Sequence, residues 1–154
     1  ANQSPQRIRP KTLNTGKKCI ICMEHAAETV HKELKNMLTD DAIHGVGYFN
    51  DETQKFIHTS GDLNQRYDKK VFDDILENAF LDVWGAFSQE KMYASTLHAT
   101  TRVYDEYVDT VMPLGEREGI VFIIDRDAEY QYPAIVEKIE ATITQHESGG
   151  GLES

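Results

Sequence analysis

Hydrophobic and polar residues follow two different periods along the chain, and the changes of period divide it into predicted elements. Apolar residues recur three and four positions apart from Lys17 to Leu38, which predicts a first helix with Thr15 or Asn14 as its cap. Two runs rich in strand-forming residues follow, at 42–50 and 55–61, separated by the polar break DETQ. This pair is therefore predicted to form a hairpin.

A second helix is predicted where helical spacing of apolar residues returns, between Phe72 and Phe87. Asp68 precedes this run and is the predicted cap, because an aspartate oxygen accepts from the free N–H groups of a first turn. The residues 62–70, in which this spacing is absent, are expected to be a loop.

Three more strands and a closing helix complete the pattern. Strict alternation predicts a third strand over 97–104 and a fourth over 107–114, joined by the acidic pair at 105–106. The run IVFII at 120–124 is apolar at every position, which predicts a central strand covered on both faces. The closing helix begins at Pro133 and carries its apolar positions at Ile135, Val136, Ile139 and Ile143.

The element order α-β-β-α-β-β-β-α predicts an α+β fold, an α/β sandwich in which helices pack on the faces of one five-stranded antiparallel sheet. A chain of 154 residues is the size of one domain, which we place at 17–146. Residues 1–16 are expected to be a flexible basic arm, and 147–154 a flexible Gly-rich tail or cloning scar.

Two glycines in the first strand indicate close packing on one face. Alternation places Gly45 and Gly47 with Ile43 and Phe49, whereas His44, Val46 and Tyr48 face the other way. Missing side chains leave room for a helix or for a ligand.

Net charge narrows the range of partners. The formal charge is −10, yet residues 1–18 hold five basic residues and no acid, which leaves −15 for the rest. Nucleic acid is not expected as a partner, because phosphate binding needs clustered Lys and Arg. There is no apolar run as long as a membrane span and no secretory signal, so a cytoplasmic location is expected.

Candidate catalytic and metal-binding residues do not form a recognisable motif. Cys19 and Cys22 form a C-x-x-C pair but lie in the apolar stripe of the first helix, where buried small side chains are the favoured interpretation. Ser60, His58 and Asp62 are too close in sequence for a hydrolytic triad, and no G-x-S-x-G turn is present. We therefore expect no catalytic site, no enzyme activity and no cofactor.

A metal site is the remaining chemical alternative. His44, His58 and His98 all lie on predicted strands, and three converging histidines could bind a metal. Asp125 and its acidic neighbours Asp127 and Glu129 follow the central strand but lack the glycine and the final glutamate of a calcium loop. Solvent-facing histidines and turn acids are the favoured interpretation, so no metal is expected.

The element order, with GVGYFNDETQKFIHTSG as its first hairpin, resembles the roadblock and dynein light chain family, whose topology is related to that of profilin and longin. This resemblance implies a non-enzymatic homodimer or heterodimer that serves as a platform for a small GTPase or a motor assembly. Subunits of that family extend the sheet across the dimer and set their second helices side by side.

The resemblance and the apolar surplus of the second helix together suggest a subunit interface. The predicted interface residues are Phe80, Trp84, Phe87, Val103 and Ile123. Trp84→Ala is then expected to leave a folded monomer, whereas a core tryptophan would leave a destabilising cavity.

These observations lead to two hypotheses about the function, which belong to different classes of protein. The leading hypothesis is a regulatory scaffold or protein-interaction module that self-associates as a homodimer and binds a small GTPase or other regulatory partner. The alternative is a sensory domain that binds a small molecule between the sheet and the helices. Its predicted ligand-binding residues are Tyr48, His98, Arg102 and Tyr104, with Trp84 as a further wall.

Overall fold

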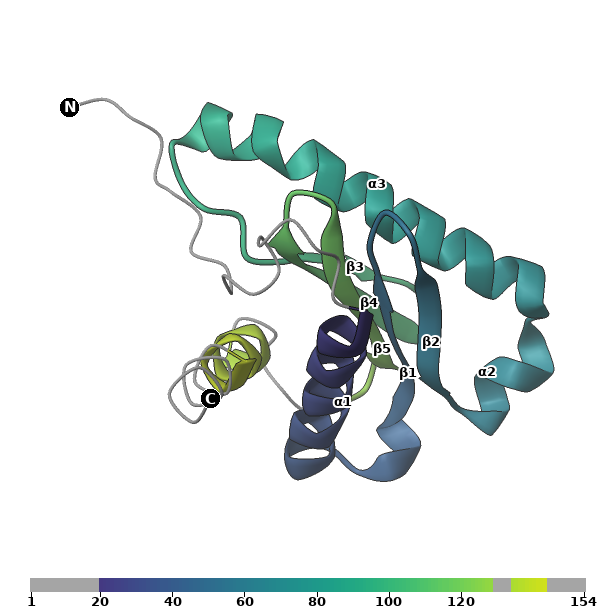
Figure 1. The fold of residues 1–154 in the computed structure, drawn as a ribbon. Coiled ribbons are helices and arrows are strands. Elements are labelled where there is room, and N and C mark those ends of the chain that lie inside the picture. The colour runs from purple at the N-terminus through teal and green to yellow at the C-terminus, as the bar shows by residue number, and fades with distance from the viewer. Residues whose placement is uncertain (1–19, 129–133, 144–154) are drawn as a thin grey trace.

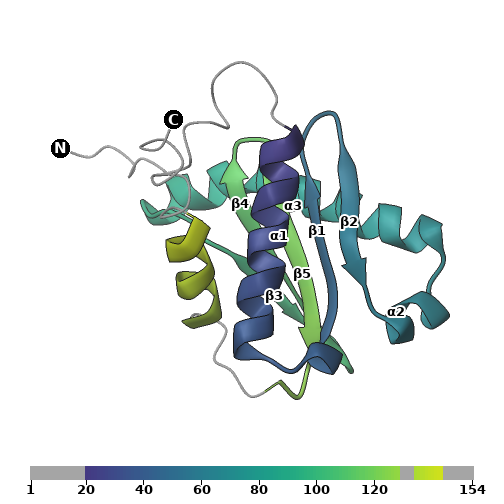
Figure 2. The same ribbon diagram turned by 60° about the horizontal axis from the view of Figure 1, so that its bottom comes forward.

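The chain folds into three layers, with a five-stranded sheet between two layers of helices (Figure 1). The structure is a computed structural model that describes residues 20–128 and 134–143, except for the side chains of 20–22. Helix α1 (Ile20–Met37) and the closing helix, described over 134–143, cover one face. Helices α2 (Gly61–Arg66) and α3 (Lys69–Tyr93) cover the other, as the turned view shows (Figure 2).

The sheet is antiparallel throughout, with strand order β2-β1-β5-β4-β3. Its strands are β1 (Ile43–Phe49), β2 (Gln54–Thr59), β3 (Thr100–Val103), β4 (Tyr107–Gly115) and β5 (Glu118–Asp125). The apolar strand β5 is in the middle and is buried from Glu118 to Ile124, so the predicted central strand is confirmed. The edge strands are β2 and β3.

Alternation along the strands divides the core in two. On the α1 side, Phe122 and Ile124 of β5 pack with Val108 and Met112 of β4. The predicted apolar face of the closing helix, Ile135, Val136, Ile139 and Ile143, belongs to this cluster. On the α3 side, Val121 packs against Leu76, Ala79 and Val83 of the helix.

The predicted alternation of β1 is wrong at its first two residues. The register with β5 shifts between Ile43 and Gly45, because one extra residue is inserted in β1. Ile43 therefore joins the α1-side core, whereas the His44 ring contacts Tyr107 edge to face on the α3 side. A bulge of this kind has no signature in the apolar pattern.

The two β1 glycines do accept a helix layer. A Cβ built on Gly47 would lie 3.1 Å from Leu76 Cδ2 of α3 and 3.0 Å from the Lys55 carbonyl oxygen. Around Gly45 the nearest atoms belong to Phe56, Ile123 and Leu63. Side chains from the chain itself thus fill the space that the glycines leave.

Three element boundaries differ from the prediction. Residues 62–66, expected to be loop, belong to α2, because Ser60 Oγ accepts from the Leu63 amide and Tyr107 anchors the helix at Asp62. Helix α3 extends to Tyr93, well past Phe87. Strand β3 starts only at Thr100, since the Leu97 amide donates to the Glu90 carboxylate at 2.8 Å.

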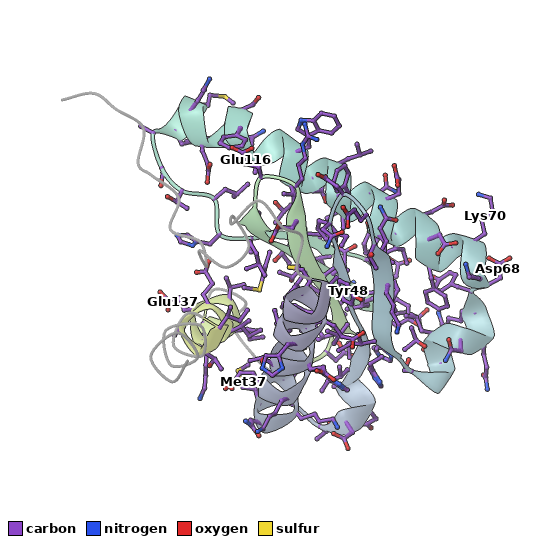
Figure 3. The ribbon with its side chains drawn as sticks, viewed as in Figure 1. Met37, Tyr48, Asp68, Lys70, Glu116 and Glu137 are labelled. Carbon is purple, nitrogen blue, oxygen red and sulfur yellow. The ribbon has the colours of Figure 1, made fainter. Side chains whose placement is uncertain are left out.

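The cap predicted for the long helix is confirmed. Asp68 Oδ1 accepts from the Val71 amide at 3.2 Å, and the start of α3 lies at the labels Asp68 and Lys70 (Figure 3). The predicted caps of the first helix, the cysteine Cys19, the acid Glu129 and both terminal segments lie outside the described residues.

Candidate functional site

A groove runs between α3 and the β3 edge of the sheet. Near the C-terminal half of α3 it opens into a cavity of about 820 Å³, lined by Leu81, Gly85 and Tyr93 on the helix side and by Thr100 on the strand side. Near the N-terminal half, a cavity of about 600 Å³ lies between Ile75 of α3 and Tyr104, which follows β3. The strand thus runs antiparallel to the helix, with the groove between them.

An ion pair crosses the groove between these cavities. The Arg102 guanidinium of β3 donates two hydrogen bonds to the Asp82 carboxylate of α3, at 2.6 and 2.5 Å. The hydrogen bond to Asp82 raises the pKa of Arg102. This bidentate pair fastens an edge strand to the helix that covers it.

Asp109 of β4 lies directly opposite Arg102 in the strand register, but the Arg102 side chain is bonded to Asp82 instead. Asp109 Oδ1 is buried and has no hydrogen-bond donor. Burial raises the pKa of the Asp109 carboxyl, an effect that nearby Arg102 opposes. The groove therefore contains an acidic group whose charge is incompletely compensated.

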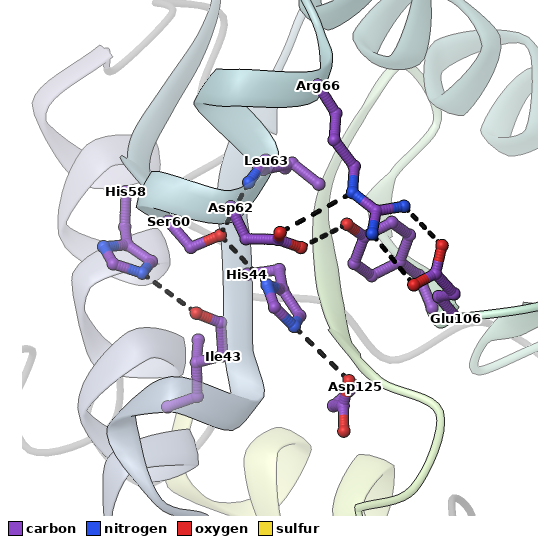
Figure 4. A network of polar contacts seen from close by, with 10 residues as sticks. Ile43, His44, His58, Ser60, Asp62, Leu63, Arg66, Glu106 and Asp125 are labelled. Atoms are coloured by element: carbon purple, nitrogen blue, oxygen red, sulfur yellow. Dashed lines mark hydrogen bonds and ion pairs between the residues drawn. The ribbon is translucent and has the colours of Figure 1, made fainter.

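A polar network forms one end of the groove (Figure 4). Tyr107 of β4 donates to Asp62 of α2 at 2.6 Å, and Arg66 of α2 bonds both oxygens of Glu106 in the β3–β4 turn. Burial, followed by the bond to Asp62, raises the pKa of Tyr107 to about 12. The network ties α2 to the β3–β4 turn.

His44 connects this network to the end of β5. Its Nδ1 is hydrogen-bonded to Ser60 Oγ at 2.9 Å, and its Nε2 lies 3.5 Å from Asp125 Oδ1 (Figure 4). The ring is only 6% exposed. Ser60 also caps α2, so this contact positions the helix against the sheet.

The predicted ligand-binding residues are not all brought together. Tyr48 is 1% exposed and lies between α1 and the sheet, on the face away from the groove (Figure 3). His98 Nδ1 lies 2.9 Å from a Glu140 oxygen of the closing helix. Arg102 and Tyr104 line one cavity, whereas Tyr48 is buried on the opposite face of the sheet, so a ligand site built from all four residues is wrong.

The predicted interface residues are also divided. Ile123 is 4% exposed and packs in the core with Leu63, so its assignment to an interface is wrong for the folded chain. Val103, in contrast, is 58% exposed on the edge strand β3. The three aromatic residues lie elsewhere, on α3.

Helix α3 has two exposed flanks, one on each side of its buried stripe. The flank toward β3 consists of Leu81, Asp82, Gly85 and Gln89, which line the groove. The aromatic flank consists of Phe80, Trp84 and Phe87. Because successive helix residues are turned by about 100°, these three lie on the other side of the buried residues of α3 from the β3 flank.

Trp84 has the environment of a surface residue. It is 56% exposed, with the Arg117 guanidinium carbon 5.5 Å above its ring. Phe80 lies edge to face with both Trp84 and the core residue Phe49, so it supports the aromatic flank from below. The alternative of a core tryptophan is therefore excluded.

The three strand histidines do not converge. His58 lies on the α1 side, stacked on His31 at 4.4 Å between ring centroids, whereas His44 lies on the α3 side. Within residues 20–128 and 134–143 no three His, Cys, Asp or Glu side chains are grouped as metal ligands.

Sequence reasoning missed Asp82 and Asp109. Asp109 carried a usable signal, since it is an acidic residue inside an otherwise largely apolar strand. Asp82 had none, because an acid on a helix surface is ordinary. None of the helices in the described part of the chain has the length and apolarity needed to cross a membrane.

Comparison of residues 28–144 with protein families finds a match to the family described as a domain of unknown function, DUF7522. The chain belongs to this family. A search of curated proteins gives no match for this DUF7522 domain.

The domain is similar in fold to solved structures at low sequence identity. An MglB structure with a tetrameric arrangement is 10% identical, with a TM-score of 0.55 over 82% of this chain and 87% of the other. MglB from Myxococcus xanthus is 11% identical, with a TM-score of 0.52 and the same coverages. A Roadblock/LC7 domain from Streptomyces avermitilis is 10% identical, with a TM-score of 0.49 over 84% and 94%. The predicted roadblock-like α+β fold is confirmed.

Proposed function

We propose that this DUF7522 domain is a non-enzymatic protein-interaction module that self-associates through β3 and the β3 flank of α3. The observation that carries the proposal is the groove of about 820 Å³ beside β3, which pairs on one side only among the strands of the described residues. The strand would pair with its copy across a two-fold axis, and the two α3 helices would lie side by side.

Gly85 makes the helix contact possible. It lies on the β3 flank, and apart from its chain neighbours and the nearby backbone of its own helix no described atom lies within 4 Å of the position that a Cβ would occupy. A residue without a side chain in the exposed middle of a helix costs stability unless close packing compensates. A second helix packed against Gly85 would provide this compensation.

Gly85→Arg tests this interface. The single chain has space for the new side chain, but a partner helix would be displaced, so the variant is expected to be a folded monomer. Sedimentation equilibrium at micromolar concentration should show a dimer for the wild-type protein, and circular dichroism should show equal helix content for both. The matched control is Trp84→Ala on the aromatic flank, which should stay dimeric.

The reverse result, a dimeric Gly85→Arg and a monomeric Trp84→Ala, would transfer the interface to the aromatic flank predicted from the sequence. A wild-type protein that is monomeric at high concentration would contradict self-association itself.

The aromatic flank is the surface that we assign to a regulatory protein partner, for which a small GTPase remains our expectation. Trp84 and Phe87 are large and exposed, and Arg117 lies over the Trp84 ring, a composition typical of interaction hot spots. Purified small GTPases from the host, loaded with GDP or a GTP analogue, can be titrated against the domain by fluorescence anisotropy. Trp84→Ala should weaken binding of the GTPase at least tenfold while the dimer persists. Equal affinity of the wild-type protein and the variant would show that the aromatic flank does not bind the GTPase. A cytoplasmic location belongs to the same proposal.

A further inference from the structure

The N-terminal end of the groove has the features of a small-molecule site. The cavity of about 600 Å³ is adjacent to a smaller one of about 270 Å³, and both are lined by Ile75, Tyr104 and Asp109. We call these two spaces together the Asp109 cavity. The volume of the larger space lies within the range of about 300 to 1,000 Å³ that is typical of cavities that hold small ligands.

The walls of the Asp109 cavity are apolar and aromatic. Leu63, Val71, Ile75 and Ile123 supply aliphatic surface, and the exposed rings of Tyr67 and Tyr104 supply aromatic surface. Tyrosine rings attract organic cations through the negative potential of their faces. Apolar walls of this kind favour a ligand with a hydrocarbon body.

The charges at the cavity favour a cation. Among the described residues that line the larger space, Asp105, Glu106 and Asp109 are acidic and Arg66 alone is basic. The Arg66 guanidinium is already bonded to Glu106 and lies 3.6 Å from Asp62. The other nearby cation, Arg102, is bonded to Asp82, so neither arginine neutralises Asp109 fully.

Asp109 is the natural anchor. The residue lines both parts of the cavity, and its buried Oδ1 has no hydrogen-bond donor. A partly buried carboxylate with an unpaired oxygen is costly, and a cationic group of a ligand beside the carboxylate would offset that cost. A positively charged donor satisfies both the hydrogen bond and the charge.

From this geometry we infer that the Asp109 cavity binds an organic ammonium compound, a protonated amine with a compact hydrocarbon body. The ammonium group pairs with the Asp109 carboxylate, and the hydrocarbon body lies against Ile75, Tyr67 and Tyr104. This inference goes beyond the proposed self-association. The cavity lies beside the N-terminal half of α3, whereas Gly85 lies in the C-terminal half.

The probe for the test is phenethylammonium, with 2-phenylethanol as its uncharged counterpart. Both are titrated into full-length protein labelled with nitrogen-15 at neutral pH, and amide chemical shifts are followed. We expect saturable shifts at Ile75, Tyr104 and Asp109 with phenethylammonium, and at least about tenfold weaker binding of the alcohol.

Asp109→Asn should weaken phenethylammonium binding at least about tenfold, because the amide has the shape of the carboxylate without its charge. The matched control is Asp73→Asn, which removes an exposed α3 carboxylate that pairs with Lys69 outside the cavity. This control should bind as the wild-type protein does. Equal losses in both variants would mean that only the general negative charge attracts the probe, and would overturn the inference.

Two further outcomes would also overturn the inference. One is the absence of saturable shifts in the wild-type protein. The other is binding that occurs only in monomeric Gly85→Arg, which would show that the second copy fills the cavity. Both are distinguishable from failure of the dimer proposal, because sedimentation reports the dimer independently of the probe.

Discussion

At the scale of the residue, Asp109 combines a structural cost with a location in a cavity. Its strand neighbours are mostly apolar and buried, and its cross-strand neighbour Arg102 is bonded elsewhere. Burial raises the pKa of its carboxyl, so the folded chain favours the protonated form more than the unfolded chain does. This difference makes the stability of the fold depend on pH.

Asp109→Asn is expected to stabilise the fold at neutral pH by about 1 kcal/mol, since it removes a partly buried carboxylate whose Oδ1 has no hydrogen-bond donor. A raised folded pKa contributes stability below the unfolded value of about 3.9, which is lost as pH rises through the folded pKa. The gain in the free energy of unfolding of Asp109→Asn over the wild-type protein should therefore appear as pH rises above about 4 and then become constant. Urea unfolding of both proteins across this range measures it. A difference in stability independent of pH would contradict the assignment.

At the scale of the element, α3 shows how local chemistry determines helix ends. Asp68 begins the helix by binding the Val71 amide, and Ala94 ends it in the left-handed conformation with φ of 50°. The interior spacing of apolar residues predicts the helix but not its full length. Its last turns follow Phe87 and carry Glu90, whose carboxylate accepts the Leu97 amide.

Asp68→Ala should lower the free energy of unfolding by about 1 kcal/mol, because the first turn of α3 loses the acceptor for its N–H group. Asp68→Asn, which keeps an acceptor oxygen, should retain most of the stability. Thermal and urea unfolding of the three proteins provide the comparison. Equal losses for alanine and asparagine would show that the charge of Asp68, and not its cap bond, stabilises the helix.

At the scale of the whole molecule, the sheet has two edges with different surroundings. Strand β2 carries Lys55, a charged residue of the kind that discourages edge pairing. Strand β3 ends in exposed Val103 and lies beside the groove of α3. The two edges therefore provide an internal comparison for self-association.

Hydrogen exchange at low and high protein concentration should separate the edges. If β3 pairs with its copy, amides in Thr100–Val103 should exchange more slowly at the concentration that favours the dimer, whereas those in Gln54–Thr59 should not change. The Gly85→Arg variant should lose the concentration dependence at β3. Slowing at β2 instead would place the dimer on the opposite edge.

The sequence by itself determined the fold class and the content of the core. IVFII is apolar at every position and cannot be stable with a face in water, so a central place for β5 followed from hydrophobic burial alone. The closing helix and the cap at Asp68 followed in the same way from local periodicity and local hydrogen bonding. Such features depend on neighbours a few residues apart, which the sequence displays directly.

Only the tertiary structure decided which of the candidate residues meet. Phe80, Trp84 and Val103 were predicted to share one surface, but α3 carries its aromatic flank on the side away from β3. Arg102 was predicted as a ligand anchor, yet its side chain is bonded to Asp82 and leaves Asp109 Oδ1 without a hydrogen bond. Such pairings depend on the rotation of a helix over a sheet and on one inserted residue in β1, and both are set by long-range packing that no local pattern records.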